Sequence, residues 1–222
     1  MPDLPTPGAT ERTQVHRLPK LAVHDRAKLS EILDEGIVAH VGVVDAGGQP
    51  FTIPCGFARD GDRVLLHGSN ASRLFRTIAS GAPICVTVTL LDGLTYGRSL
   101  FESSMRYRSA VVLGRGEQVG DGELLDGLLL LADKLLPGRV ADARQPNERE
   151  LAQTMLVSVP LDEVSVKVGV EFATDQAEDL DLPYWAGVLP LQTVAGAPID
   201  APDLGPNRPV PSYVTDHPLR NW

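Results

Sequence analysis

Residues 64–78 read VLLHGSNASRLFRTI, and within this stretch the hydrophobic period changes from that of a strand to that of a helix. The run that ends at His67 is apolar and typical of a buried strand. Leu74, Phe75 and Ile78 then recur at the spacing of one helical face. The stretch therefore predicts a strand, a short polar loop and a helix that crosses to the next strand.

Four further β-type runs flank this unit, and each is rich in Val, Ile, Leu or Phe. They cover residues 37–44, 51–58, 84–91 and 106–114. Turn residues at 45–50 (DAGGQP) and at Asp60-Gly61 predict that the first three strands, the third ending at His67, form an antiparallel meander. The later run at 155–170 predicts one or two closing strands. We therefore expect a mainly β fold of the α+β class.

Two more helices are predicted on either side of these strands. Asp25 is placed to cap a short helix in which Leu29 and Ile32 recur at helical spacing, and Gly36 ends it. Residues 123–136 (ELLDGLLLLADKLL) predict another helix, which is apolar on most of its sides. Such a helix must be covered, either by the sheet or by a second subunit.

The chain divides into one folded domain and two less regular ends. Residues 1–20 carry four prolines without hydrophobic periodicity, and they predict a flexible arm or a segment that lies across a partner subunit. Residues 21–190 carry the strand and helix patterns and form the predicted domain. Residues 191–222 are again rich in proline and predict a tail that wraps around the domain without adding to its core.

Composition limits the partners and the compartment. The net charge is −9 and the pI is near 5.0, so no nucleic acid and no anionic membrane is expected as a partner, because both attract basic surfaces. Cys55 and Cys85 are too few for a disulfide framework and are expected as reduced thiols. The sequence has no signal-peptide pattern and no run of 18 apolar residues, so a cytoplasmic location is expected.

The loop 67–73 (HGSNASR) is the first candidate site. The start of a helix presents unpaired N–H groups and the positive end of the helix dipole, which together suit a phosphate. Arg73 would add a charge-assisted contact, and a serine hydroxyl a further donor. The same residues also fit a simpler interpretation, in which Ser69 or Asn70 only caps the helix and Arg73 is a solvated surface residue.

Strand alternation in residues 103–109 (SSMRYRS) gives a second candidate. It places Arg106 and Arg108 on one face of a strand and Tyr107 and Ser109 on the other. Such a set could hold a phosphate and a ring system. The alternative is a solvated strand edge beside a core tyrosine.

The positions of the histidines and the absence of common catalytic motifs limit the kinds of chemistry that the chain can perform. The five histidines are scattered without a close pair or a cysteine partner, so no metal site is expected. His67 ends a strand beside the candidate loop, where it could contact a flavin ring, ligate a haem or simply lie partly exposed. The sequence has no G-x-G-x-x-G, P-loop or G-x-S-x-G motif. Any chemistry is therefore expected to come from a cofactor.

Three pieces of sequence together resemble a known family. They are His67-Gly68 followed by Ser72-Arg73, the triplet Tyr107-Arg108-Ser109 before a valine-rich strand, and residues 185–190 (WAGVLP). In this order, over roughly residues 18–190, the chain resembles the flavin-nucleotide-binding branch of the pyridoxamine 5'-phosphate oxidase-like proteins. This branch includes the nitroimidazole-resistance-type proteins.

The resemblance implies an FMN-binding split β-barrel, a Greek-key-like antiparallel barrel with flanking helices. It also implies a homodimer with FMN in the cleft between the subunits. On this basis Ser72 and Arg73 hold the cofactor phosphate, with His67 and Gly68 beside it. The other residues that the resemblance assigns to the cofactor are Thr52, Ile53, Pro54 and Cys55 along the isoalloxazine, Tyr107, Arg108 and Ser109 from the second half of the barrel, and Trp185, which closes the site.

The resemblance also implies a function, with departures from the family pattern at Glu102-Ser103, where relatives carry histidines, and at Gly169, where they tend to carry an arginine. The expected function is that of an FMN-dependent oxidoreductase, which transfers hydride between a reduced donor and a small organic acceptor or oxygen. One alternative is a deazaflavin-dependent reductase. Another is a non-catalytic protein that binds, stores or senses flavin or haem.

Overall fold

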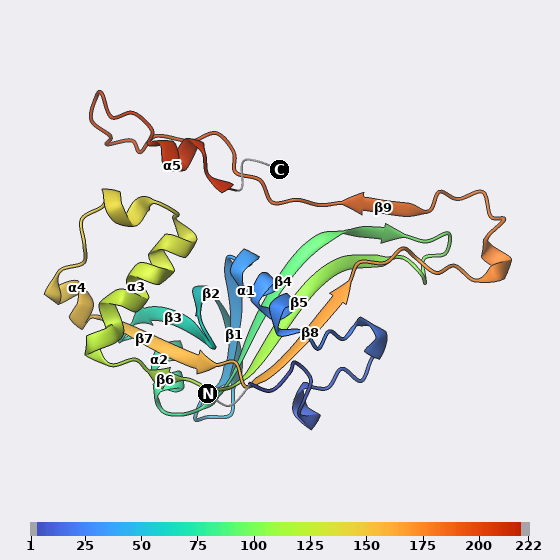
Figure 1. Cartoon of the computed structure of the whole chain (residues 1–222), viewed down its shortest axis with the longest axis horizontal. Helices are drawn as coiled ribbons and strands as arrows, with labels where there is room; N and C mark the ends of the chain where they lie inside the picture. The colour runs from blue at the N-terminus through green and yellow to red at the C-terminus, as the bar shows by residue number, and fades with distance from the viewer. Residues whose placement is uncertain (1–3, 219–222) are drawn as a thin grey trace.

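The computed structural model describes residues 4–218, so residues 1–3 of the predicted arm and 219–222 of the predicted tail lie outside the described residues. In the described part, nine strands form one antiparallel sheet in the order β6-β7-β3-β2-β1-β4-β5-β8, with β9 paired to β4 (Figure 1). The sheet curls into a half-barrel flanked by helices, which confirms the predicted split-barrel fold. The strands are β1 Val38–Val44, β2 Pro50–Asp60, β3 Arg63–Ser69, β4 Pro83–Tyr96, β5 Ser104–Arg115, β6 Glu117–Gln118, β7 Thr154–Pro160, β8 Glu163–Gly169 and β9 Gly187–Pro190.

The predicted meander of β1, β2 and β3 is confirmed. The Asp45 carboxylate closes the first hairpin, because its Oδ1 accepts hydrogen bonds from the backbone N–H groups of Gly47 and Gln49 at 2.9 and 3.0 Å. Gly61 allows the second turn, since its φ of +55° suits glycine. The chain then crosses over to β4, which pairs with β1. The predicted closing run forms two strands, β7 and β8, which pair with β3 and β5.

Two helices pack on one side of the curled sheet, which we call the inner face and which carries Val41, Val86 and Ala110. The helix α1 (Arg26–Glu35) begins at Asp25, whose carboxylate accepts from the Ala27 N–H at 2.8 Å, and it ends at Gly36, as predicted. The helix α2 (Arg73–Ala79) is the predicted crossing helix. The apolar residues that bury these helices in the main core are Leu29, Ile32, Leu33, Leu74, Phe75 and Ile78.

The helix α3 (Asp121–Leu135) packs on the opposite side of the sheet, the outer face. Its Leu131 lies in a small core with Ala58 and Leu65. Leu125 and Leu130 stay 38% exposed, so the sheet covers only one side of this apolar helix. Two short helices follow, α4 (Glu148–Ala152) and α5 (Ser212–Thr215). No helix within residues 4–218 is both long enough and apolar enough to cross a membrane.

The described part of the N-terminal arm lies against its own domain instead of extending freely. The Gly8 N–H donates to the Val164 carbonyl at 2.7 Å, and the Val23 N–H donates to the Val166 carbonyl at 3.0 Å. Thr13, which lies between these contacts along the chain, is 2% exposed. Because β8 is an edge strand, its outward backbone groups need partners, and the arm supplies them.

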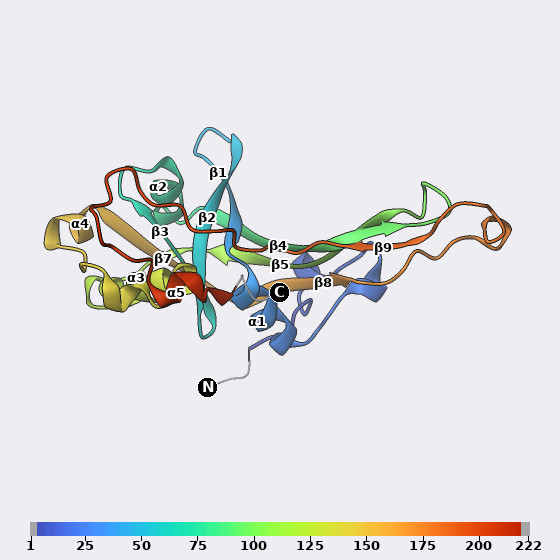
Figure 2. The same ribbon diagram turned by 90° about the horizontal axis from the view of Figure 1, so that it is seen from above.

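The C-terminal segment is fixed at two places. Near its start β9 pairs with the outer half of β4, and near its end Tyr213 donates a hydrogen bond to Asp142 at 2.8 Å, close to the end of α3. Between these places the chain is extended and passes across the molecule (Figures 1 and 2). Beneath it the outer face is open over β1 and β4, where Val38 and Leu91 are each 48% exposed.

Candidate functional site

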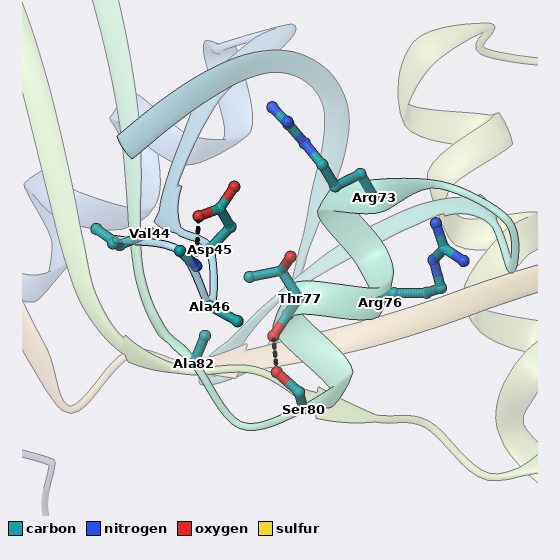
Figure 3. A pocket seen from close by; sticks show the side chains of 9 residues that line it. Val44, Asp45, Ala46, Arg73, Arg76, Thr77, Ser80 and Ala82 are labelled. Atoms are coloured by element: carbon teal, nitrogen blue, oxygen red, sulfur yellow. Dashed lines mark hydrogen bonds between the residues drawn. The ribbon is translucent and has the colours of Figure 1, made fainter. Parts of the chain in front are cut away.

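An open pocket of about 460 Å³ lies between the β1–β2 turn and one side of α2 (Figure 3). The sequence predicts this end of the molecule as the phosphate site, through the loop that leads into α2. The pocket combines two guanidinium groups, two hydroxyls and one carboxylate. Its lining residues are Val44, Asp45, Ala46, Gly47, Arg73, Arg76, Thr77, Ser80 and Ala82.

Arg73 is held in place by an aromatic ring and not by an acid. Its guanidinium carbon lies over the Phe51 ring, 3.9 Å from the ring centre. Within residues 4–218, neither Arg73 nor Arg76 forms an ion pair, whereas Arg59, for example, is paired with Asp34. Both free guanidinium groups are therefore available to an anion from outside the chain.

The loop before α2 leaves a hydroxyl available beside Arg73. Ser72 occupies the N-cap position of α2, and its side chain makes no capping hydrogen bond. Ser69 and Asn70 do not cap the helix, because the Ser69 Oγ accepts from the Ala71 N–H and the Asn70 amide donates to the Ala152 carbonyl. The capping part of the simpler interpretation, with Ser69 or Asn70 as the cap, is therefore wrong, whereas its other part agrees with the structure, since the Arg73 side chain is exposed.

Gly68 has a packing reason to be glycine. A Cβ atom built there would lie 2.3 Å from the Phe75 ring, closer than real contacts allow. Phe75 belongs to α2 and is only 4% exposed. The close approach of β3 to this ring therefore fixes where α2 begins, and with it the positions of Ser72 and Arg73.

The β2 segment assigned to the cofactor presents its side chains alternately to the two faces of the sheet. Thr52 and Pro54 share the outer face with Ala58, which packs against α3, while Ile53 and Cys55 point to the inner side. Thr52, Ile53 and Pro54 are exposed, so this part of β2 is uncovered on both sides. Burial raises the pKa of the Cys55 thiol, which keeps it protonated at neutral pH.

His67 lies on the outer face by the same alternation, since it is two residues after Leu65 on β3. Its side chain is exposed, and it pairs in register with Leu156 of β7. Partial burial by the surrounding chain lowers the pKa of His67, so the imidazole is neutral at pH 7. A neutral imidazole is the form that binds a metal or accepts a hydrogen bond.

Arg108 forms ion pairs with neighbouring acidic residues. Its guanidinium donates to Asp92 at 2.9 and 2.8 Å and to Glu35 at 2.7 Å, and it forms a further ion pair with Glu31 at 3.2 Å. These hydrogen bonds, to Asp92 first and then to Glu35, raise the pKa of Arg108. The ion pairs of Arg108 connect α1 to β4 and β5 on the inner face. They occupy the N–H donors of the guanidinium, so Arg108 has little capacity left to bind a cofactor.

Tyr107 and Ser109 share the outer face with Thr52, but β1 and β4 lie between them and β2. Three strand spacings correspond to about 14 Å. Trp185 is farther away, because it packs against Tyr96 in a tilted arrangement with ring centres 5.5 Å apart, at the opposite end of β4 from the pocket. The twelve residue-to-residue steps from Ile84 to Tyr96 span about 40 Å. One copy of the chain therefore does not bring Trp185 to Arg73.

Three residues of this region do not stand out in the sequence: Arg76 and Asp45, which line the pocket, and Phe51, which contacts Arg73. The signal for Arg76 was present, because it follows Arg73 by three residues and so shares its helical face. Phe51 and Asp45 gave no such signal, since only the β1–β2 hairpin brings them next to α2.

Solved structures of two proteins match most of this chain. The FAD and heme binding protein from Mycobacterium smegmatis is 39% identical, with a TM-score of 0.85 over 88% of this chain and 96% of its own. The flavocytochrome Anf3 from Azotobacter vinelandii is 36% identical, with a TM-score of 0.87 over 93% of this chain and 96% of its own. No curated protein matches the sequence.

A third solved structure supports the fold alone. It is a putative 5-nitroimidazole antibiotic resistance protein from Bacteroides thetaiotaomicron VPI-5482, 22% identical, with a TM-score of 0.58 over 66% of this chain and 86% of its own. The family model for pyridoxamine 5'-phosphate oxidase matches residues 25–168, which include the β2 segment, the α2 loop and the Arg108 cluster. The chain therefore belongs to the pyridoxamine 5'-phosphate oxidase family of split-barrel proteins.

Proposed function

We propose that this chain is a flavin-nucleotide-binding redox protein in which Arg73 and Ser72 hold the cofactor phosphate. The observation that carries the proposal is an arginine without an acidic partner, beside a free hydroxyl, in a chain of net charge −9. An acidic protein repels anions in general, so it needs local cations of this kind to hold a phosphate. The descriptions of two relatives, as an FAD and heme binding protein and as a flavocytochrome, support the same conclusion.

The chain's own residues would bind and orient the flavin. When bound, the flavin would supply hydride or electron transfer between a reduced donor and a small organic acceptor or oxygen. Thr52, Ile53 and Pro54 are exposed on β2 directly after Phe51, so they offer a strand surface against which a ring system can lie. The Cys55 thiol stays protonated and does not act as a nucleophile.

A second candidate function is haem binding with His67 as the axial ligand. The observation that favours it is a neutral, exposed imidazole on the open outer face. Histidine is a usual axial ligand of haem iron. His40, also exposed on the outer face but on β1, provides the matched comparison.

We also propose that two copies associate through the open outer face. Exposed apolar side chains there include Val38 and Leu91, and Leu125 and Leu130 of α3 add to them. Exposed apolar surface of this extent is typical of a surface covered by a partner. A second copy would also offer Trp185, which is 67% exposed, to the site that its own chain does not reach.

The cofactor is identified by spectroscopy and titration. Protein expressed with riboflavin and a haem precursor is expected to show flavin absorption, and a Soret band only if haem also binds. Titrations of the cofactor-free protein with FMN, FAD, a deazaflavin and haem then rank these cofactors by their affinity. A protein that binds none of them contradicts the proposal.

The phosphate contact is tested by replacing Arg73. Arg73→Ala is expected to weaken flavin binding at least about tenfold, the loss of one charge-assisted hydrogen bond. As a control, Arg149→Ala, which changes an exposed arginine of α4 away from the pocket, should leave the flavin affinity unchanged.

For haem binding, His67→Ala should abolish the Soret band, whereas His40→Ala should keep it. Mass measurement in solution tests the dimer, and a monomer at micromolar concentration contradicts it.

A further inference from the structure

We propose that residues 191–210, which we call the strap, bind a second copy of this chain when that copy lies on the outer face. Each copy would then hold its partner with its own strap. The inference rests on the proposed association through the outer face, and it adds a separate contact to that association. It gives a role to a segment that contributes nothing to the core of its own domain.

The strap buries almost none of its surface against its own domain. All of its residues except Ala195 are exposed, and Val194 and Ile199 are 60% and 95% exposed. Within residues 4–218, the strap makes one hydrogen bond to the domain, from the Leu191 N–H to the Asp92 carbonyl at 3.1 Å. Apolar side chains that gain no burial in their own chain do not offset the entropy lost when the segment is ordered. They therefore indicate a contact with a surface outside the chain.

The two ends of the strap lie on either side of the open outer face. The strap starts on β4, where Asp92 directly follows the exposed Leu91. Beyond its other end, the Tyr213 hydroxyl accepts a hydrogen bond from Arg139 at 2.9 Å and donates one to Asp142 at 2.8 Å, both of which follow α3. Between these attachments the chain passes across the molecule (Figures 1 and 2). A partner that lies on the face between β4 and α3 is therefore next to the strap.

The open face is suited to a second copy because it carries no charge. Residues 38–44, 52–56 and 85–91 include no Asp, Glu, Lys or Arg, and the one such residue in 107–113, Arg108, points to the inner face. The first nine residues of the strap are uncharged as well. Two copies, each of net charge −9, repel one another over most of their surface. Two identical uncharged faces can still meet around a twofold axis without burying a charge.

Proline prepares the strap for such a contact. Pro198, Pro202, Pro206 and Pro209 fix the backbone φ at four positions and favour an extended chain. A stiff segment loses less conformational entropy on binding than a flexible one. The strap can therefore hold its apolar side chains out toward a partner although its own domain gives it little support.

The first test is photo-crosslinking in the full-length chain. Ile199 is replaced by the photoreactive residue benzoylphenylalanine in a chain labelled with heavy nitrogen, which is then mixed with an excess of the unlabelled wild-type chain. After irradiation, mass spectrometry distinguishes crosslinks within the labelled chain from crosslinks to an unlabelled copy. Position 199 is expected to crosslink to the unlabelled copy. The same replacement at Leu18, an exposed residue of the N-terminal arm, should give no crosslink between copies.

The second test measures the dissociation constant of the dimer by sedimentation. The double variant Val194→Asp, Ile199→Asp is expected to raise this constant at least about tenfold, because it places two charges where apolar side chains contact the partner. Both residues are exposed in the single chain, so its thermal unfolding should change little. The control Leu18→Asp should change the dissociation constant less than twofold.

The possible outcomes separate the strap contact from the other proposals. If the wild-type chain is a monomer at micromolar concentration, the association and the strap contact both fail, whereas flavin titration of the same protein still decides the flavin site. If the wild type forms a dimer but the double variant has the same dissociation constant, the strap contact alone is overturned. It is also overturned if every crosslink from position 199 stays within the labelled chain.

Discussion

The Arg73 guanidinium stacks on the Phe51 ring, 3.9 Å from the ring centre, and this contact holds a cation at the mouth of the pocket without neutralising it. An acidic partner would orient the arginine as well, but it would compete with an anionic ligand. An aromatic face attracts the cation through its quadrupole and leaves the N–H donors at the edge of the guanidinium free. Phe51 is therefore a positioning residue for the proposed phosphate contact.

Replacing Phe51 by leucine should weaken flavin binding through Arg73. The loss of a partly exposed cation–π contact corresponds to about 0.5–1 kcal/mol, or a dissociation constant about twofold to fivefold higher. Titration of the folded variant with FMN measures the effect. Phe172→Leu removes the ring beside Arg106, 5.8 Å away, and serves as the control. Equal weakening in both variants would show that the Phe51 ring does not act through Arg73.

Arg108 is predicted to be structural, because three acids surround it. Arg108→Gln should lower the free energy of unfolding by about 2 kcal/mol, since it removes charge-assisted hydrogen bonds to Asp92 and Glu35 and leaves these acids close together. The flavin affinity of the folded variant should change less than twofold. Urea unfolding and FMN titration measure the two quantities.

The matched control for Arg108 is Arg144→Gln, which breaks an exposed pair with Glu150. This change should have little effect on stability, because solvent screens exposed ion pairs. A variant Arg108→Gln of normal stability that no longer binds flavin would instead place Arg108 at the cofactor.

Much of the fold could be predicted from local sequence patterns. The strands around β1 to β5 and the helix ends at Asp25 and Gly36 depend on hydrophobic period and on turn or cap residues, which are encoded within a few positions. The contacts of the N-terminal arm with β8 could not be predicted in this way. They depend on an unpaired sheet edge that exists only after the fold has formed.

The candidate site could be predicted only in part, for the same reason. Ser72 and Arg73 can be predicted as phosphate ligands, because they follow a strand directly and the pattern lies within a few positions of the sequence. Asp45 reaches the pocket, and Phe51 reaches Arg73, from the β1–β2 hairpin, and the acids that pair with Arg108 come from α1 and β4. The alternation of side chains along β5 places Arg108 on the opposite face from Tyr107, but it does not predict which acidic residues lie there to pair with Arg108.

Gly68→Ala should destabilise the domain by about 2 kcal/mol, because the added methyl group overlaps the buried Phe75 ring and forces it to move. The displacement should also weaken flavin binding, since Phe75 and Arg73 belong to the same short helix. Thermal unfolding and FMN titration measure both effects. Gly114→Ala, on β5, is the control, because its new methyl group would meet its nearest neighbour at an ordinary 3.6 Å. Similar losses in both variants would contradict the packing role of Gly68.

Lys134 should make the stability of the domain depend on pH in the alkaline range. Its ammonium group donates to the Leu33 carbonyl near the end of α1 at 2.6 Å and lies 3.5 Å from the centre of the Phe57 ring. Burial lowers the pKa of Lys134 to about 8, from an ordinary value of 10.5. Between pH 8 and pH 10.5 the Lys134 side chain is protonated in the unfolded chain but has lost its proton in the folded chain. Below pH 8 the buried ammonium group therefore lowers the free energy of unfolding. This unfavourable effect disappears as the pH rises toward 10.5.

The variant Lys134→Met isolates this effect, because methionine keeps most of the apolar stem and has no charge to desolvate. Free energies of unfolding in urea at several pH values from 7 to 10.5 give the comparison. The stability of the wild-type chain should rise relative to that of the variant as the pH increases, whatever the difference is at pH 7. Lys28→Met, which removes a surface ammonium paired with Glu31, should run parallel to the wild type across the same range. A constant difference between the wild type and Lys134→Met would mean that Lys134 keeps its ordinary pKa and that burial does not disfavour its charge.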